Sequence, residues 1–71
     1  LMESSMNIQE KIQLIEMFNN TIKHRKEMRE KMTKLLNVPG NSDLPAFIQQ
    51  LDDEIEMNLG YLQKIEQLNV T

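Results

Sequence analysis

Hydrophobic positions in the second half of the chain recur with the spacing of an amphipathic helix. They are separated by four and three residues alternately, which is the a/d pattern of a heptad repeat. The set comprises Leu44, Ile48, Leu51, Ile55, Asn58, Leu62, Ile65 and Asn69. Because only its two asparagines are polar, the pattern predicts a long helix with one apolar seam.

A comparable stripe runs through the first half of the chain. Its members are Ile8, Ile12, Ile15, Phe18, Ile22, Arg25, Met28 or Arg29, Met32 and Leu36. Asn7 followed by Glu10 resembles a capping box, with Asn in place of Ser or Thr. This pair therefore predicts where the first helix begins.

A cluster of helix breakers separates the two stripes. Pro39, Gly40 and Pro45 fall in one short window, in which Ser42 or Asp43 can cap a second helix. The pattern predicts a helix over 7–37, a turn over 38–42 and a helix over 43–69, so that 7–71 form a single helical hairpin. Residues 1–6 are expected to be a flexible end, partly foreign to the protein because the chain starts at Leu1.

Folding the chain about Gly40 predicts which residues face each other. In an antiparallel hairpin the numbers of facing residues then sum to about 80, so almost every apolar seam residue meets an apolar partner. Arg25 falls opposite Ile55, beside three carboxylates, of which Asp52 or Glu56 is the expected partner and Glu54 is less favoured. Residues 23–34 have a net charge of +4 and residues 52–56 a net charge of −4, so opposite charges help to set the register.

The length of the chain limits what such a hairpin can do alone. About 60 ordered residues cost roughly 1.5 kcal/mol each, and a single two-helix seam does little more than offset that cost. We therefore expect an all-α, coiled-coil-like antiparallel hairpin that dimerisation or a partner completes to a four-helix bundle. The expected interaction face is Met17, Met57, Leu59 and Tyr61, and the buried polar residues expected to select register and oligomeric state are Asn19, Arg25 and Asn58.

Composition excludes several kinds of chemistry. The chain has no cysteine and a single histidine, His24, and the acidic run at 52–56 lacks the loop of a calcium site, so neither a metal nor a cofactor is expected. The net charge of −3 disfavours nucleic acid, and the short apolar runs disfavour a membrane span. Without a secretory leader, an intracellular location is expected, with the cytoplasm favoured.

One segment resembles a known family. Arg25-Lys26-Glu27-Met28, a turn, and then Ile48-Gln49-Gln50-Leu51-Asp52 resemble the small sporulation-regulating aspartyl-phosphate phosphatases of bacilli, which are two-helix hairpins with a Ser-Gln-Glu-Leu-Asp signature. Gln49, Leu51 and Asp52 match that signature, and Ile48 stands in the place of its serine. The resemblance implies that Gln49 and Asp52 would be presented to a response-regulator phospho-aspartate and its attacking water.

The sequence thus favours a function in protein–protein interaction. The leading hypothesis is a hairpin that mediates self-association or docks to a protein partner, with a homodimer or a partner helix as the expected assembly. The alternative is a small regulatory phosphatase that acts on an aspartyl-phosphate, so enzymatic activity stays open but is less favoured.

Overall fold

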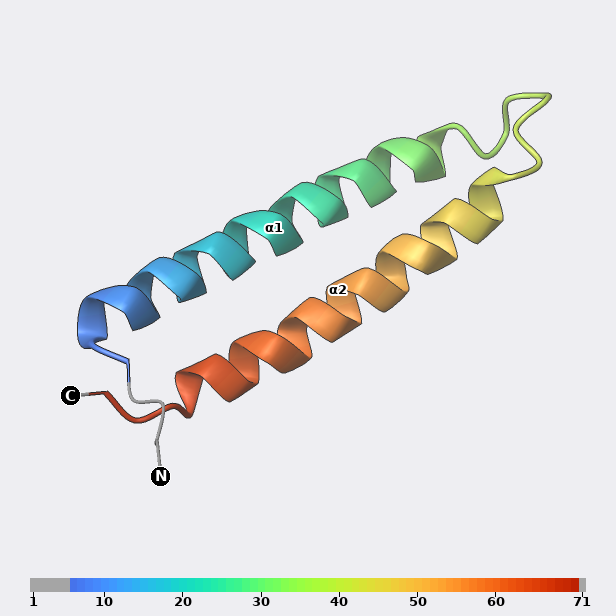
Figure 1. Cartoon of the computed structure of the whole chain (residues 1–71). Coiled ribbons are helices and arrows are strands. Elements are labelled where there is room, and N and C mark those ends of the chain that lie inside the picture. The colour runs from blue at the N-terminus through green and yellow to red at the C-terminus, as the bar shows by residue number, and fades with distance from the viewer. Residues whose placement is uncertain (1–5, 71) are drawn as a thin grey trace.

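The chain folds into two antiparallel helices joined by one turn (Figure 1). The computed structural model describes residues 6–70, in which α1 spans Ile8–Lys34 and α2 spans Leu44–Glu66. The pair forms a thin rod with dimensions of 56 × 21 × 12 Å. The prediction of an all-α helical hairpin is therefore confirmed. In the described part of the chain, neither helix combines the length and the hydropathy needed to cross a bilayer.

The start of α1 follows the capping pattern in the sequence. Asn7 has extended backbone angles, and its side-chain oxygen accepts a hydrogen bond from the backbone N–H of Glu10 at 2.9 Å. The Asn7 amide in turn donates to the Glu10 carboxylate at 2.7 Å. One of the backbone N–H groups that a helix start leaves unsatisfied is therefore capped, and the second hydrogen bond holds the two side chains together.

Both helices are a few residues shorter than predicted. After Lys34 the chain tightens into three-residue turns, in which Leu35 and Leu36 donate to Met32 and Thr33 at 3.0 and 3.3 Å. Gly40 then adopts a φ of 89°, a left-handed conformation that costs glycine little. At the start of α2, Asp43 occupies the cap position but makes no side-chain capping bond, so the capping predicted there is wrong for Asp43.

Contacts between the helices agree with the predicted register. Phe18 meets Tyr61 with ring centroids 6.2 Å apart, and Arg25 forms an ion pair with Glu54. The residue numbers in both pairs sum to 79, close to the expected value of about 80 for a hairpin folded about Gly40. The buried side chains among the described residues are Ile22, Leu51 and Leu62, all of which were predicted to lie in the seam.

The open end of the hairpin is closed by a lysine. The Lys11 ammonium donates to the backbone carbonyls of Glu66 and Leu68 at 2.7 and 3.0 Å. These carbonyls lie at the end of α2, where helical partners run out and the helix dipole favours a cation. Met6 and Val70 form an isolated bridge beside this contact. Met6 is thus paired with the other end of the chain, whereas the rest of the expected flexible end, residues 1–5, lies outside the described residues.

The capping box makes a direct test of the start of α1. Asn7→Ala removes both hydrogen bonds with Glu10 and should lower the free energy of unfolding by about 1 kcal/mol. Urea denaturation followed by circular dichroism measures this change. Gln9→Ala is the control, because Gln9 is exposed in the same turn and should change stability little. Equal effects of the two substitutions would contradict the capping role.

Candidate interaction surface

Large apolar side chains that the seam does not use lie on one side of the hairpin. Phe47, Glu54 and Tyr61 follow each other at intervals of seven on α2, and Met57 lies three residues after Glu54. On α1 the corresponding line is Leu14, Thr21 and Met28, with Met17 between the first two. We call this side the apolar flank and define it by Leu14, Met17, Met28, Phe47, Met57 and Tyr61.

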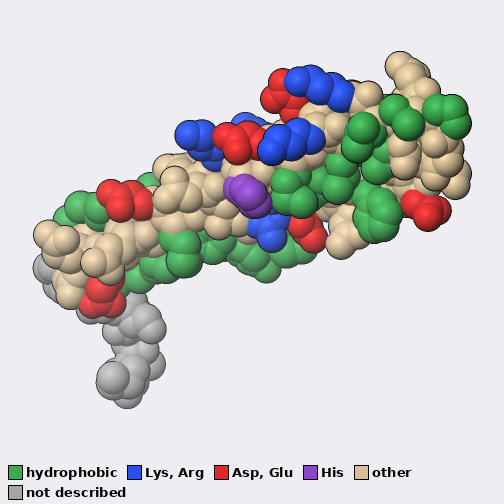
Figure 2. Space-filling model, turned by 90° about the horizontal axis from the view of Figure 1, so that it is seen from above, with side chains coloured by type: hydrophobic (Ala, Val, Ile, Leu, Met, Phe, Trp, Pro, Cys, Tyr) green, Lys and Arg blue, Asp and Glu red, His purple; other side chains and the backbone are tan. Residues whose placement is uncertain are grey.

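Contacts between the helices show that the two lines belong to the same side. Tyr61 lies against Phe18, and the Glu54 carboxylate reaches Arg25, which follows Thr21 by one turn. Met17 and Met57 are each 54% exposed, and Tyr61 is 45% exposed. Figure 2 shows hydrophobic side chains gathered along one long edge of the molecule, at the bottom of the view, while Lys and Arg side chains lie mostly along the other edge.

Leu59 does not share the apolar flank, contrary to the sequence-based expectation. It is two residues from both Met57 and Tyr61, which is about 200° around the axis of an α-helix. It instead follows Asp52 by seven residues, and it is 43% exposed there. Of the four predicted face residues, Met17, Met57 and Tyr61 therefore lie together, and Leu59 lies on the opposite side, which we call the charged flank and which also carries Lys23, Lys26, Asp52 and Glu56.

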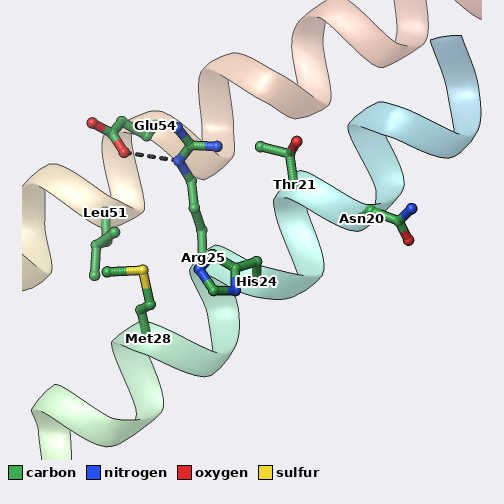
Figure 3. Close-up of a pocket in the computed structure, with 7 residues that line it drawn as sticks. All are labelled: Asn20, Thr21, His24, Arg25, Met28, Leu51 and Glu54. Carbon is green, nitrogen blue, oxygen red and sulfur yellow. Dashed lines mark hydrogen bonds and ion pairs between the residues drawn. The ribbon is translucent and has the colours of Figure 1, made fainter.

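An open pocket of about 580 Å³ interrupts the apolar flank near its middle. Figure 3 shows the Arg25 side chain extending from α1 towards Glu54 on α2, with Met28 and Leu51 beside it. The remaining lining residues are Asn20, Thr21 and His24. The pocket therefore combines apolar walls with a hydroxyl group and a charged pair.

The charged pair in this pocket differs from the pairing expected from the sequence. Arg25 Nε donates to Glu54 Oε2 at 2.8 Å, whereas Asp52 and Glu56 were the favoured partners. Asp52 is instead bound by Arg29, which belongs to the next turn of α1. The reason is the direction of the side chains: Glu54 projects onto the apolar flank as Arg25 does, and Asp52 projects onto the charged flank. Both pairs are half-exposed, so they help to set the register more than they stabilise the fold.

Two donors hold Glu54 in its ionised form. The guanidinium of Arg25, followed by the side-chain amide of Gln50, lowers the pKa of the Glu54 carboxyl from its ordinary value of 4.5. Gln50 lies one turn before Glu54 and donates to Oε1 at 3.3 Å, so each carboxylate oxygen has a donor. The pocket thus keeps a fixed negative charge beside a fixed positive one.

The two asparagines expected to be buried in one layer differ in their surroundings. Asn58 is half-buried, and its side-chain oxygen is shielded from solvent with no hydrogen-bond partner among the described residues. Asn19 is exposed in the hairpin, so the prediction that it is buried is wrong for a single copy. Asn19 precedes Lys26 by seven residues, so it shares the side of α1 that belongs to the charged flank.

The residues implied by the phosphatase resemblance lie on the charged flank and its outer edge. Gln49 is exposed, and its amide donates to the Asp53 carboxylate at 3.0 Å. Asp52, three residues further on, accepts a hydrogen bond from Arg29 Nε. Each of the two side chains is therefore engaged with a different neighbour, and the pocket lies on the other side of the molecule.

Comparison with known proteins gives no relative for this chain: no family model, curated protein or solved structure matches it. The function must therefore be argued from the apolar flank and its pocket. Sequence reasoning missed that Lys11 binds the end of α2 and that Thr21, Met28 and Glu54 line a pocket. Heptad positions assigned to both helices would have shown that the last three share one side.

The lowered pKa of Glu54 predicts a pH dependence of stability. A carboxyl whose pKa is lowered by folding adds stability above its unfolded pKa, and that stability is lost as the pH falls through the folded pKa. Glu54→Gln should therefore reduce the thermal midpoint at neutral pH, and the difference from wild type should narrow as the pH is taken below 4.5. Melting curves across this range measure it. Glu56→Gln is the control, since Glu56 is exposed and has no ion pair among the described residues. An equal change of the thermal midpoint in Glu56→Gln would contradict the role of Arg25.

The unpaired oxygen of Asn58 predicts a stabilising substitution. A buried polar atom without a partner costs about 1–3 kcal/mol, and leucine is apolar and of similar size. Asn58→Leu should therefore raise the free energy of unfolding by about 1 kcal/mol or more. Urea denaturation at several protein concentrations measures the gain. A loss of stability would show that the amide makes a compensating interaction.

Proposed function

We propose that this hairpin is a protein–protein interaction module that binds through its apolar flank. The observation that supports the proposal is the imbalance between buried and exposed apolar side chains. Three side chains are buried among the described residues, while Met17, Phe47 and Met57 are each half-exposed or more on one side. An apolar surface of this kind, with a pocket that holds a charged pair near its middle, is typical of a contact site on a small protein.

The composition of the flank suits such a role. Methionine is flexible and polarisable, so it adapts to different partner surfaces. Tyrosine combines a large ring with a polar tip and is enriched among the residues that contribute most to binding. The charged flank offers no equivalent surface, because Lys23, Lys26 and Glu56 lie among its few apolar side chains.

The size of the hairpin also supports a role in association. The chain has 71 residues and no cysteine, so no disulfide can compensate for its small core. Its broad side measures 56 × 21 Å, which leaves room for the roughly 800 Å² per partner that a typical specific interface buries. Covering the apolar flank would bring the amount of buried apolar surface closer to that of an ordinary bundle.

Two substitutions that match in chemistry and exposure test the proposal. Tyr61 and Leu59 are 45% and 43% exposed, and they lie on opposite sides of α2. Tyr61→Glu should weaken association by at least about tenfold, because it places a charge in the contact, whereas Leu59→Glu should leave association within about twofold of wild type. Circular dichroism confirms that both variants stay helical.

Association is measured in two ways. Light scattering across a dilution series gives the molar mass of the chain alone. In the second measurement, wild-type and variant hairpins are immobilised, and the amounts of other proteins that each recovers from a cell extract are compared. Association in at least one of these measurements, lost with Tyr61→Glu and kept with Leu59→Glu, supports the module. Association in neither measurement, or equal loss in both variants, contradicts it.

A further inference from the structure

We infer that the apolar flank binds a second copy of this chain in an antiparallel arrangement, in which Tyr61 of each copy inserts into the pocket of the other. This inference rests on the proposed function and names its partner. The flank carries two half-exposed aromatic side chains, Phe47 near the turn and Tyr61 nearer the open end, and one pocket between them along the hairpin. Tyr61 is the one whose exchange with the pocket centres the dimer on α1. Two identical surfaces of this kind complement each other when a two-fold axis exchanges projection and hollow.

The positions of the two features determine the place of the axis. Tyr61 lies opposite Phe18, and the pocket is centred near Arg25, seven residues further along α1. At 1.5 Å per residue the two features are about 10 Å apart along the hairpin. The two-fold axis lies in the interface, perpendicular to both helices and midway between Tyr61 and the pocket. It therefore crosses α1 at the level of Thr21 and Ile22. It packs α1 on α1 and α2 on α2 of the other copy, with each pair antiparallel.

The same axis leaves the two copies in almost complete overlap. Thr21 is the midpoint of α1, which spans Ile8–Lys34. A dimer arranged around this level covers the flank from the turn to the open end, and four helices of similar length then enclose one core. An axis near either end would have left half of the exposed methionines and aromatics uncovered, so the pocket lies where a full-length dimer requires it.

The lining of the pocket suits a tyrosine side chain. Met28 and Leu51 provide apolar contact for the ring, and the sulfur of methionine packs favourably against aromatic rings. The Thr21 hydroxyl and the Arg25–Glu54 pair can bond the phenol O–H, which needs a partner when it is buried. With a volume of about 580 Å³ the pocket is within the usual range for bound organic groups, so it can admit one phenol ring.

The charges on the flank also permit self-association. Arg25 and Glu54 neutralise each other at its centre, so two copies meet without a like-charge contact at the pocket. On the charged flank, Lys23 and Lys26 of two copies would be brought close together by a similar two-fold axis. The apolar flank is therefore the side on which a second copy fits.

Distances between spin labels test the arrangement. The protein has no native cysteine, so single-cysteine variants at Gln13, Glu27 and Lys34 can each be labelled at one site. These exposed positions are spaced by multiples of seven and share one side of α1, away from the apolar flank. In the antiparallel dimer the two copies of each label are separated along the helix direction by about 17 Å for Glu27, 26 Å for Gln13 and 38 Å for Lys34.

Other outcomes of this experiment overturn the inference in distinguishable ways. Three equal distances show a parallel dimer, which contradicts the exchange of Tyr61 and leaves the interaction module intact. The absence of dipolar coupling at every site, with a monomer at all concentrations, excludes the second copy. In that case the recovery experiment decides the proposed function. Recovery of a different protein by the wild-type and Leu59→Glu hairpins, but not by the Tyr61→Glu hairpin, supports it, and any other result contradicts it.

A double-mutant cycle tests the contact itself. Within one hairpin Tyr61 faces Phe18, and Met28 lies ten residues beyond Phe18, a rise of roughly 15 Å, so the two substitutions should act independently there. In the proposed dimer they touch across the interface. Tyr61→Ala and Met28→Ala should each raise the dissociation constant of the dimer at least about fivefold. The double variant should have a dissociation constant at least about threefold lower than the value obtained by multiplying the two separate effects. If the effect of the double variant equals the product of the two single effects, the two side chains do not touch across the interface and the proposed contact is wrong.

Discussion

The seam between α1 and α2 is the contact on which the whole fold depends, and it is narrow. Two helices that meet along a single line can cover only the side chains that point directly at each other. Ile22, Leu51 and Leu62 are covered in this way, and the apolar side chains one position further round each helix stay partly in water. The exposed apolar flank is therefore a direct result of building a domain from two helices. A third or fourth helix is the usual way to cover such a surface, which is why the fold and the proposed function are linked.

The sequence predicted the architecture well because each level of it pointed to the same answer. The heptad spacing, the Asn7–Glu10 cap and the cluster around Gly40 are local signals, and the hairpin follows from them without long-range information. The register followed as well, because an antiparallel hairpin with a short turn leaves little freedom in how its residues pair.

The surface was harder to predict because it depends on direction around each helix axis. Met57, Leu59 and Tyr61 are close together in the sequence, yet a step of two residues turns a side chain to nearly the opposite side. For the same reason Arg25 binds Glu54 rather than Asp52. The contact of Lys11 with Glu66 and Leu68 joins residues more than 50 positions apart through backbone carbonyls, and backbone acceptors leave no trace in the identity of the side chains.

Both ends of the described chain emerge at the same end of the rod, next to the Lys11 contacts and the Met6–Val70 bridge (Figure 1). This placement determines how the molecule responds to mechanical force. Tension applied between the two ends acts across the seam rather than along it, so it loads the lysine contacts first and then one layer of side chains at a time. Such a geometry opens like a zipper, at low force and in small steps, from the ends towards Gly40. An identical rod pulled from one end and from the turn would have to slide all of its layers at once.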